Sequence, residues 1–366
     1  MTQVQVPNVT PASNLVGTEL PGGWKIVEQL PRPGNFGAEE LTGSWFSLGY
    51  IATDGKRKAF VKVIDVQRAL QASPGVPLIE RLRKLTESHT FECAILEICG
   101  KARLDRVVRV LSKGELPPPE GAALAVEIPY IMFELADGDV RKIVSRANKV
   151  EDAWRFGVLH DVAVGIQQLH GQAIAHQDLK PSNVLIFDDD RMGAKIGDLG
   201  RASRRGMDAA HDGMTIAGAS NYAPPEQVYG VVPERWEDRR EGCDLYHLGS
   251  LATFLFAGVT PAIYFARVLP DEVKPVLWGG KGLSDYQSAM PLLSSAFAQF
   301  IDSIRKDLPT WAEPEMTQII MNACNPDFTY RGDPAARRQV GKAIGIASFV
   351  SRFDRLAKRA IVESRG

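Results

Sequence analysis

The chain has 366 residues, of which 45% are hydrophobic and 24% are charged, a composition typical of folded globular proteins rather than of disordered or disulfide-rich chains. Lys and Arg number 43 against 44 Asp and Glu, so the formal net charge is −1. Because no basic excess is available to bind phosphate backbones, we expect no nucleic-acid partner. The length allows one large domain or two ordinary ones.

The cysteines and the apolar pattern indicate the cellular compartment of the protein. Cys93, Cys99, Cys243 and Cys324 form no CxxC pair and no spacing typical of secreted proteins. No apolar run reaches the roughly 18 residues of a membrane helix, and the first residues lack the basic and apolar regions of a signal peptide. We therefore expect a cytoplasmic protein with reduced cysteines and no membrane partner. Nothing in the pattern predicts its oligomeric state.

The first third of the chain has the pattern of short strands. Residues 1–22 are polar, contain Pro and Gly, and are predicted to form a flexible arm. The Asp54-Gly55 pair predicts a tight turn between two strands. The predicted elements are strands over Lys25–Leu30, Ser47–Ala52 and Lys58–Ile64, a helix over Leu78–Cys99, and strands over Val107–Leu111 and Tyr130–Glu134.

The rest of the chain has the pattern of helices. Over Glu151–His170, apolar residues recur at steps of three and four, and Gly171 then stands where a left-handed C-terminal cap is expected. Further helices are predicted over Asp244–Ala257, Tyr286–Lys306, Glu315–Cys324 and Asp333–Lys358. A small strand-rich part is therefore followed by a larger helical part.

The segment Ile174–Ile186, I-A-H-Q-D-L-K-P-S-N-V-L-I, follows the first of these helices directly. It resembles the catalytic loop of eukaryotic-type (Hanks-type) Ser/Thr protein kinases, whose pattern H-R-D-L-K-P-x-N it matches except at the Arg, where Gln177 stands. The resemblance implies that Asp178 orients an attacking hydroxyl and accepts its proton. It also implies that Asn183 binds Mg²⁺ and that Lys180 neutralises charge on the transferred phosphoryl group.

Three later motifs fit the same family. Lys195–Gly200, K-I-G-D-L-G, is similar to the D-F-G motif and implies that Asp198 binds the Mg²⁺ that bridges the ATP phosphates. Asn221–Glu226 resembles the end of an activation segment, and the resemblance pairs Glu226 with Arg331. Asp244 stands in a D-x-x-x-L-G helix, where the family's Asp anchors the backbone of the catalytic loop.

In the strand-rich part, Ala59–Val63, A-F-V-K-V, is similar to the V-A-I-K strand, which implies that Lys62 contacts the α- and β-phosphates of ATP. Its expected partner is Glu92, because Leu96 lies one turn later on the same face of the predicted helix. Glu87 and Glu97 are the alternatives.

The phosphate-covering Gly-rich loop and the nucleotide hinge are matched less well. Gly34–Gly37 and Thr42–Gly49 both qualify as the loop, although neither is an intact G-x-G-x-x-G, and we prefer the second because of its distance to Lys62. On that choice the loop residues are Gly43, Phe46 at the tip and Ser47. In the hinge, the resemblance implies backbone contacts to adenine from Glu134 and Ala136, a gatekeeping Phe133, and a ribose contact from Asp139.

Two residues depart from the family's pattern. Gln177 replaces the Arg that docks a phosphorylated activation segment in many members. Ala219 stands where the family has a Thr that bridges the catalytic Asp and Lys, and Ser220 lies one position further on. Whether Ser220 substitutes for that Thr cannot be read from the sequence.

Together the motifs predict an α+β, two-lobed protein-kinase fold. Residues 23–135 would form an N-lobe with a small antiparallel sheet and one main helix, and residues 136–366 a larger helical C-lobe. The function implied is transfer of the γ-phosphoryl group of ATP, with Mg²⁺, to Ser or Thr hydroxyls of proteins; the Ser/Thr choice rests on Lys180.

We also expect autophosphorylation on Thr215 or Ser220, where Arg201, Arg204 and Arg205 would bind the phosphate. Two alternatives stay open. One is a nucleotide-binding pseudokinase that acts as a scaffold, which the degenerate Gly-rich loop and Ala219 favour. The other is a small-molecule phosphotransferase of related fold.

Overall fold

The computed structural model describes residues 10–31, 46–71, 75–118, 126–147, 150–188, 193–339 and 344–365. The chain forms two compact units: the first comprises residues up to Arg103 together with Val108–Ala136, and the second comprises Leu104–Val107 and Asp137–Gly366. The long second segment begins one residue after the start that we expected for the C-lobe. Leu104–Val107 groups with the second unit because the Arg106 carbonyl accepts a hydrogen bond from Ile196 N and the Arg106 side chain pairs with Asp161.

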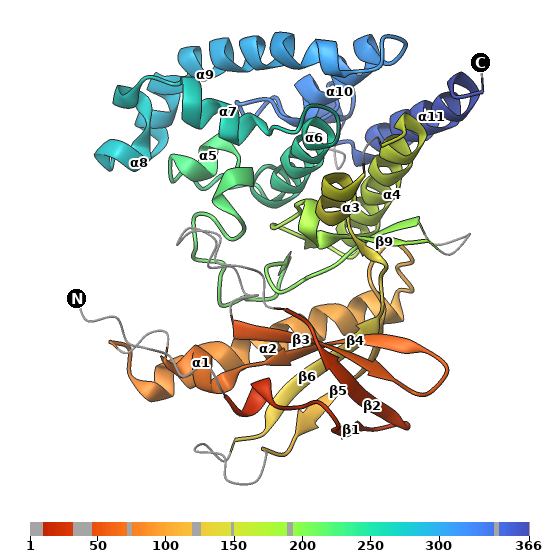
Figure 1. Cartoon of the computed structure of the whole chain (residues 1–366). Helices are drawn as coiled ribbons and strands as arrows, with labels where there is room; N and C mark the ends of the chain where they lie inside the picture. The colour runs from red at the N-terminus through yellow and green to blue at the C-terminus, as the bar shows by residue number, and fades with distance from the viewer. Residues whose placement is uncertain are drawn as a thin grey trace. The chain divides into compact units, whose positions relative to one another are not determined.

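The first unit is an antiparallel sheet with one long helix, as expected (Figure 1). The strand order is β1-β2-β3-β4-β6-β5. Its elements are β1 Glu19–Leu20, β2 Trp24–Gln29, β3 Ser47–Thr53, β4 Lys58–Ile64, β5 Val110–Leu116, β6 Ile128–Glu134, α1 Val66–Gln71 and α2 Leu78–Lys101. In β4, Ala59, Val61 and Val63 are fully buried on one face, so the alternation of a strand places Lys62 on the other.

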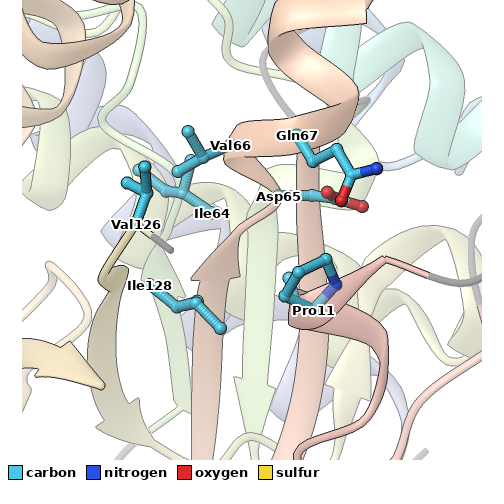
Figure 2. A pocket seen from close by; sticks show the side chains of 8 residues that line it. Pro11, Ile64, Asp65, Val66, Gln67, Val126 and Ile128 are labelled. Atoms are coloured by element: carbon cyan, nitrogen blue, oxygen red, sulfur yellow. The ribbon is translucent and has the colours of Figure 1, made fainter. Parts of the chain in front are cut away.

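The flexible arm predicted over residues 1–22 is wrong for residues 10–22, because these residues pack on the sheet. Pro11–Ser13 forms a 3-10 helix, and β1 pairs with β2. Thr10 Oγ1 donates to Asp65 Oδ2 over 2.9 Å, and the Tyr50 hydroxyl donates to the Ala12 carbonyl over 2.5 Å. Figure 2 shows a pocket that is lined by this segment, the end of β4, the start of α1 and the start of β6. Residues 1–9 lie outside the described residues.

The second unit is largely helical (Figure 1). Its short strands form two small antiparallel sheets, β10-β9-β7 and β11-β8. The strands are β7 Gly138–Asp139, β8 Ile174–Ala175, β9 Val184–Phe187, β10 Gly193–Ile196 and β11 Ser203–Arg204. The helices are α3 Val140–Arg146, α4 Asp152–Gly171, α5 Pro225–Val228, α6 Gly242–Ala257, α7 Pro261–Val268, α8 Pro275–Trp278, α9 Leu283–Ile304, α10 Glu313–Ala323 and α11 Ile346–Glu363.

Helix α6 is the centre of the second unit. Nearly all of its side chains are buried, which agrees with its almost continuous apolar sequence. A π-helical turn, Glu237–Glu241, leads directly into it. Helix α4 carries a buried apolar stripe that contacts α6, and α11 packs along α4. The catalytic-loop motif starts directly after α4, so this packed pair of helices sets its position.

Two predicted details of the helices are wrong. The helix predicted over Asp333–Lys358 is instead the 3-10 helix Ala336–Arg338 followed by α11, because Gly345 adopts a left-handed φ of 71° at the N-terminus of α11 and interrupts the helical backbone. At the end of α4, Gly171 remains helical, and the left-handed residue is Ala173, with φ 56°.

Within the described ranges, no single helix has the length and the apolar composition needed to cross a membrane. Glu237–Ala257 and Pro261–Val268 meet that test only when taken together, with a bend of 81° between them.

The burial of His247 in α6 makes the stability of the second unit sensitive to acid. Burial lowers the pKa of His247 to about 4, from an ordinary value of 6.5. Between these values the unfolded chain binds the proton and the folded chain does not, so stability falls as the pH falls through this window. We expect His247 to account for about 2 kcal/mol of the stability lost between pH 7 and pH 5.

The His247→Gln variant should therefore lose less stability than the unsubstituted chain between these two pH values, as measured by urea unfolding at each. An equal loss in both proteins would show that His247 does not cause the acid sensitivity.

Candidate functional site

In the first unit, the predicted pair of Lys62 and Glu92 is formed. Lys62 Nζ lies 2.8 Å from Glu92 Oε1, and the Glu92 side chain is buried in the middle of α2. The two alternative carboxylates are exposed and engaged elsewhere: Glu87 pairs with Arg83, and Glu97 pairs with Lys113. The choice of Glu92 is therefore confirmed as a contact.

In the second unit, the backbone of the catalytic loop is held by Asp244 of α6. This carboxylate is fully buried; Oδ2 accepts from His176 N over 2.8 Å and Oδ1 accepts from Gln177 N over 2.8 Å. Its Oδ2 also lies 2.9 Å from His170 Nε2. Burial alone would raise the pKa of Asp244, but the hydrogen bond and charge of His170, with His176 and the Gln177 amide, outweigh it and lower the pKa. The predicted anchoring role of Asp244 is confirmed.

This anchor compensates for an unfavourable backbone conformation. Gln177 has a left-handed φ of 66°, which few residues other than glycine adopt. The imidazole of His176 provides a second brace, since its Nδ1 accepts from Asp178 N over 3.2 Å and its Nε2 lies 3.0 Å from the Gly197 carbonyl. These two contacts together select the tautomer with the proton on Nε2. His176 thus links the loop to the segment that contains Asp198.

The carboxylate of Asp178 sits in a cluster of donors. Oδ1 accepts from Ala219 N over 2.8 Å, and Oδ2 accepts from Asn183 Nδ2 over 3.2 Å and lies 3.0 Å from Lys180 Nζ. A carboxylate has about four acceptor positions, so these three contacts from the described residues leave one, on Oδ1. Asp178 is therefore fixed in orientation and still able to accept one more hydrogen bond.

The contact from Ala219 reaches Asp178 from the position of the family's Thr. The backbone N–H of Ala219 donates to Asp178, whereas the side chain of Ser220 is exposed at the start of a short 3-10 helix. Gly218 allows this approach: a Cβ there would lie 2.5 Å from the Gln177 carbonyl oxygen and 2.7 Å from Asp178 Oδ1. Sequence reasoning missed Gly218, although a Gly next to the departure at Ala219 was a signal that the backbone comes close.

Asn183 and Asp198 supply oxygen ligands of the kind that a divalent cation prefers. The Asn183 amide nitrogen donates to the Asp178 carbonyl over 2.7 Å as well as to its side chain, which turns the amide oxygen away from Asp178. Asp198 has a left-handed φ of 57°. The described residues contain no cluster of three His, Cys, Asp or Glu side chains suited to a metal. A magnesium site that takes its other ligands from phosphates and water fits this set.

The residues predicted to contact the nucleotide lie in regular structure or outside the described residues. Gly43 and the alternative Gly34–Gly37 segment lie outside them. Phe46 directly precedes β3, and its carbonyl accepts from Asp65 N over 2.8 Å. Ser47 is the first residue of β3 and pairs with Ile64. Phe46 is therefore positioned by the sheet.

The predicted hinge residues come at the end of β6 and just after it. Phe133 is buried and packs against the Phe60 ring, with centroids 6.3 Å apart. Glu134 contacts Arg109 through both its backbone and its side chain. Ala136 is the last residue of the first unit. Asp139 caps α3 by accepting from Lys142 N over 2.9 Å, so a ribose would have to share its carboxylate with this cap.

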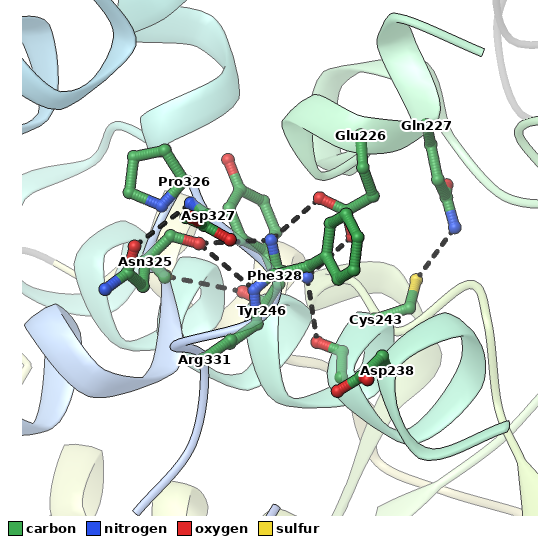
Figure 3. Close-up of polar contacts among 12 residues, drawn as sticks. Glu226, Gln227, Asp238, Cys243, Tyr246, Asn325, Pro326, Asp327, Phe328 and Arg331 are labelled. Carbon is green, nitrogen blue, oxygen red and sulfur yellow. Dashed lines mark hydrogen bonds and ion pairs between the residues drawn. The ribbon is translucent and has the colours of Figure 1, made fainter. Parts of the chain in front are cut away.

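The end of the activation segment is anchored by Glu226 and Arg331, as predicted. Figure 3 shows the pair: Nη1 and Nη2 of Arg331 contact the two carboxylate oxygens of Glu226 at 2.6 and 2.8 Å. Both side chains are almost completely buried. Arg331 also donates to the carbonyls of Asn325 and Gly242, and it stacks over the Tyr246 ring. Burial alone would lower the pKa of Arg331, but the charge of Glu226 raises it above its ordinary value.

Comparison with known proteins agrees with this geometry. Residues 122–266 match the family model of the protein kinase domain. This match and the serine/threonine-protein kinases described below support a eukaryotic-type protein kinase. The fold of the chain is accordingly the two-lobed protein-kinase fold, with an antiparallel sheet and one main helix in the first unit and a helical second unit.

Several curated kinases are similar to this chain. It is 28% identical over 252 residues to the serine/threonine-protein kinase RAD53 of Saccharomyces cerevisiae. The aligned region covers 65% of this chain and 29% of the relative. It is 30% identical over 238 residues to CBL-interacting protein kinase 20 of Oryza sativa subsp. japonica, covering 62% and 44%. Over 157 residues it is 34% identical to ribosomal protein S6 kinase alpha-1 of Homo sapiens, covering 42% and 20%. The matched part of the chain thus spans less than half the length of each of these relatives.

Replacing Gly218 by Ala should weaken the hydrogen bond between Ala219 and Asp178, because the new methyl group would collide with the catalytic loop. A hydrogen bond to a charged group contributes about 1.5–3 kcal/mol, so exchange of the Ala219 amide should become at least about tenfold faster. Hydrogen–deuterium exchange of the segment around Ala219 measures this. Gly213→Ala is the control, since its methyl group would meet nothing within 4 Å. Equal exchange rates in the two variants would contradict the steric role of Gly218.

Breaking the pair of Glu226 and Arg331 should destabilise the second unit strongly. Glu226→Ala and Arg331→Ala should each cost about 3–5 kcal/mol, because each leaves a buried charge without its partner. The double variant should lose less than the sum of the two single losses. Urea unfolding of all four proteins gives the coupling. The exposed pair of Asp354 and Lys358 on α11 serves as the control, with a coupling below about 1 kcal/mol. Additive losses at Glu226 and Arg331 would rule out an energetic role for their contact.

Proposed function

We propose that this chain is an ATP-dependent protein Ser/Thr kinase. The observation that carries the proposal is the carboxylate of Asp178, which three neighbouring donors orient and which keeps one acceptor position on Oδ1. This is the arrangement that phosphoryl transfer to a hydroxyl requires of the protein, because catalysis of this reaction consists mainly of positioning and charge stabilisation.

The cofactors proposed are ATP and Mg²⁺. Asn183 and Asp198 would hold the metal ion through their side-chain oxygens, and Lys62, kept in place by Glu92, would contact the α- and β-phosphates. When bound, the metal ion would neutralise negative charge on the phosphates. Asn183 and Asp198 fit Mg²⁺ by their chemistry, because amide and carboxylate oxygens are the ligands that a hard cation prefers.

Asp178 would act on the substrate hydroxyl. Its open acceptor position on Oδ1 would take the hydrogen bond from the hydroxyl and align the oxygen with the γ-phosphorus. As the new O–P bond forms and the bond to the ADP leaving group breaks, the hydroxyl proton passes to the carboxylate. Lys180, 3.0 Å from Oδ2, is placed to stabilise charge on the phosphoryl group during transfer.

Ser and Thr of proteins are the proposed acceptors. The retained Lys180 supports this choice, and so does the resemblance to relatives whose names describe them as serine/threonine-protein kinases. Autophosphorylation on Thr215 or Ser220 is proposed as well, since both residues are exposed. The proposed phosphate-binding role fits Arg205 poorly, because this side chain already pairs with Glu237 over 2.6 Å.

The pseudokinase alternative loses one of its two supports. Ala219 favoured it because the residue lacks the hydroxyl of the family's Thr, yet the backbone N–H of Ala219 makes a hydrogen bond to Asp178. The Gly-rich loop, its other support, falls mainly on residues outside the described part of the chain. The small-molecule phosphotransferase is disfavoured by Lys180 and by the anchored end of the activation segment at Glu226.

A cytoplasmic location is also proposed. Its support is that all four cysteines are free and buried, as is usual in a reducing compartment. Fractionation of cells that express the chain, followed by detection with an antibody, tests this location.

The Asp178→Asn variant tests the proposed function. It should lower kcat for transfer of radiolabelled phosphate to a protein substrate at least a hundredfold, because the carboxylate acts in the transition state. Binding of Mg-ATP, measured by titration calorimetry, should stay within about threefold, since Asp178 is not one of the proposed metal ligands. Asp188→Asn, which removes an exposed carboxylate of the same unit, is the control.

Three results would overturn the proposal or part of it. Wild-type protein that binds Mg-ATP and transfers no phosphate would support the pseudokinase. Transfer to a small molecule and to no protein would support the other alternative. Activity of Asp178→Asn within threefold of wild type would remove the assigned role of Asp178.

A further inference from the structure

A chain of polar contacts joins the catalytic loop to the middle of the activation segment, and its central residue is Arg240. This Arg lies in the π-helical turn before α6 and is only 4% exposed. Its Nη1 donates to Gln177 Oε1 over 3.0 Å, and Gln177 Nε2 donates back to the Arg240 carbonyl over 3.0 Å. The side chain of the residue before Asp178 is thus clamped by two reciprocal hydrogen bonds.

The other end of the Arg240 guanidinium contacts the activation segment. Its Nη2 lies 2.5 Å from Asp212 Oδ1. The Asp212 carboxylate also accepts from Ser203 Oγ and from Ala209 N, both over 2.8 Å, and Arg239 Nη2 donates to the Asp212 carbonyl over 2.7 Å. Asp212 therefore connects the start of the activation segment, the central turn of that segment and the π-helical turn.

The charges explain why these contacts belong together. Burial lowers the pKa of Arg240 and the neighbouring Arg239 lowers it further, whereas Asp212 acts in the opposite direction. A buried guanidinium without a carboxylate partner is strongly unfavourable. Asp212 supplies that negative charge from the activation segment itself, so the segment must fold back against the π-helical turn for Arg240 to be buried.

We propose that Asp212, acting through Arg240 and Gln177, positions the catalytic loop and holds the activation segment in place without phosphorylation. Asp212, Arg240 and Gln177 are positioning residues, because none of them touches the reacting atoms. A carboxylate at position 212 makes the charge-assisted hydrogen bonds that a phosphate group would otherwise have to supply. The protein should thus be active as synthesised, and modification of Thr215 or Ser220 is not required. This inference rests on the proposed kinase function.

The proposal makes a counterintuitive prediction for Gln177. The variant Gln177→Arg restores the residue that the family pattern has at this position, yet it should reduce activity here. It would place a second guanidinium against buried Arg240, and like charges in a buried site repel. Exchanging the two side chains in the double variant Gln177→Arg and Arg240→Gln restores one positive charge between the loop and Asp212. The double variant should recover activity to within about threefold of wild type. If the two substitutions acted only by damaging the structure, their separate losses of activity would instead add.

The experiment uses full-length protein that has been treated with phosphatase and shown by mass spectrometry to carry no phosphate. Its kcat should stay within about twofold of the untreated protein. Asp212→Asn should lower kcat at least about tenfold, with the KM for ATP changed less than about threefold. Asp208→Asn removes an exposed carboxylate from the same segment and should match wild type in both constants.

Hydrogen exchange provides a readout that does not depend on activity. In Asp212→Asn, amides of residues 203–212 should exchange at least about tenfold faster, while those of α9 keep their rates. If wild type transfers no phosphate but exchange rises as expected, the proposed function fails and the structural role of Asp212 holds. Loss of activity on phosphatase treatment, unchanged kcat and exchange in Asp212→Asn, or a swap variant no better than Gln177→Arg would each overturn the inference.

Discussion

The second unit depends on one buried negative charge, the carboxylate of Asp244. It accepts the backbone N–H groups of two consecutive loop residues, His176 and Gln177, and without it these donors would be buried without partners. The acceptor that α6 presents holds the backbone of the left-handed turn at Gln177. Since Asp178 follows directly, the direction of its side chain is set by a helix nearly seventy residues later in the chain.

The same principle recurs in three ion pairs of the described residues. Lys62 is held by Glu92, Arg331 by Glu226, and Arg240 by Asp212. In each pair the two partners come from distant elements, so the pair forms only when those elements are packed. Such pairs contribute little net stability compared with apolar side chains of the same size, but they penalise every alternative packing. They favour a single arrangement of each unit.

The sequence was sufficient wherever a short motif fixes both chemistry and spacing. The contacts of Lys62 with Glu92, of Glu226 with Arg331 and of Asp244 with the loop follow from such motifs. It was insufficient where a long-range contact depends on residues outside any motif. Asp212 and Arg240 belong to no motif, and the close approach at Gly218 is a property of the backbone. The arm at residues 10–22 looked unstructured because its few core residues, Ala12, Leu15 and Leu20, follow no helical or strand period. Its other contacts, such as that of Thr10 with Asp65, are polar.

The π-helical turn at Glu237–Glu241 has a consequence for how such a chain can change. Its bond from Gly242 N to the Glu237 carbonyl spans five residues, so the turn contains one residue more than an α-helix of the same rise would. Deleting one residue there would leave a regular α-helical turn, with the residues before and after it close to their present directions. Only the residues within the turn would change direction, so Arg240 would turn away from Gln177, while Asp244, which follows the turn, would keep its contacts. A change in chain length at this single point could therefore uncouple the activation segment from the catalytic loop while leaving the loop itself intact.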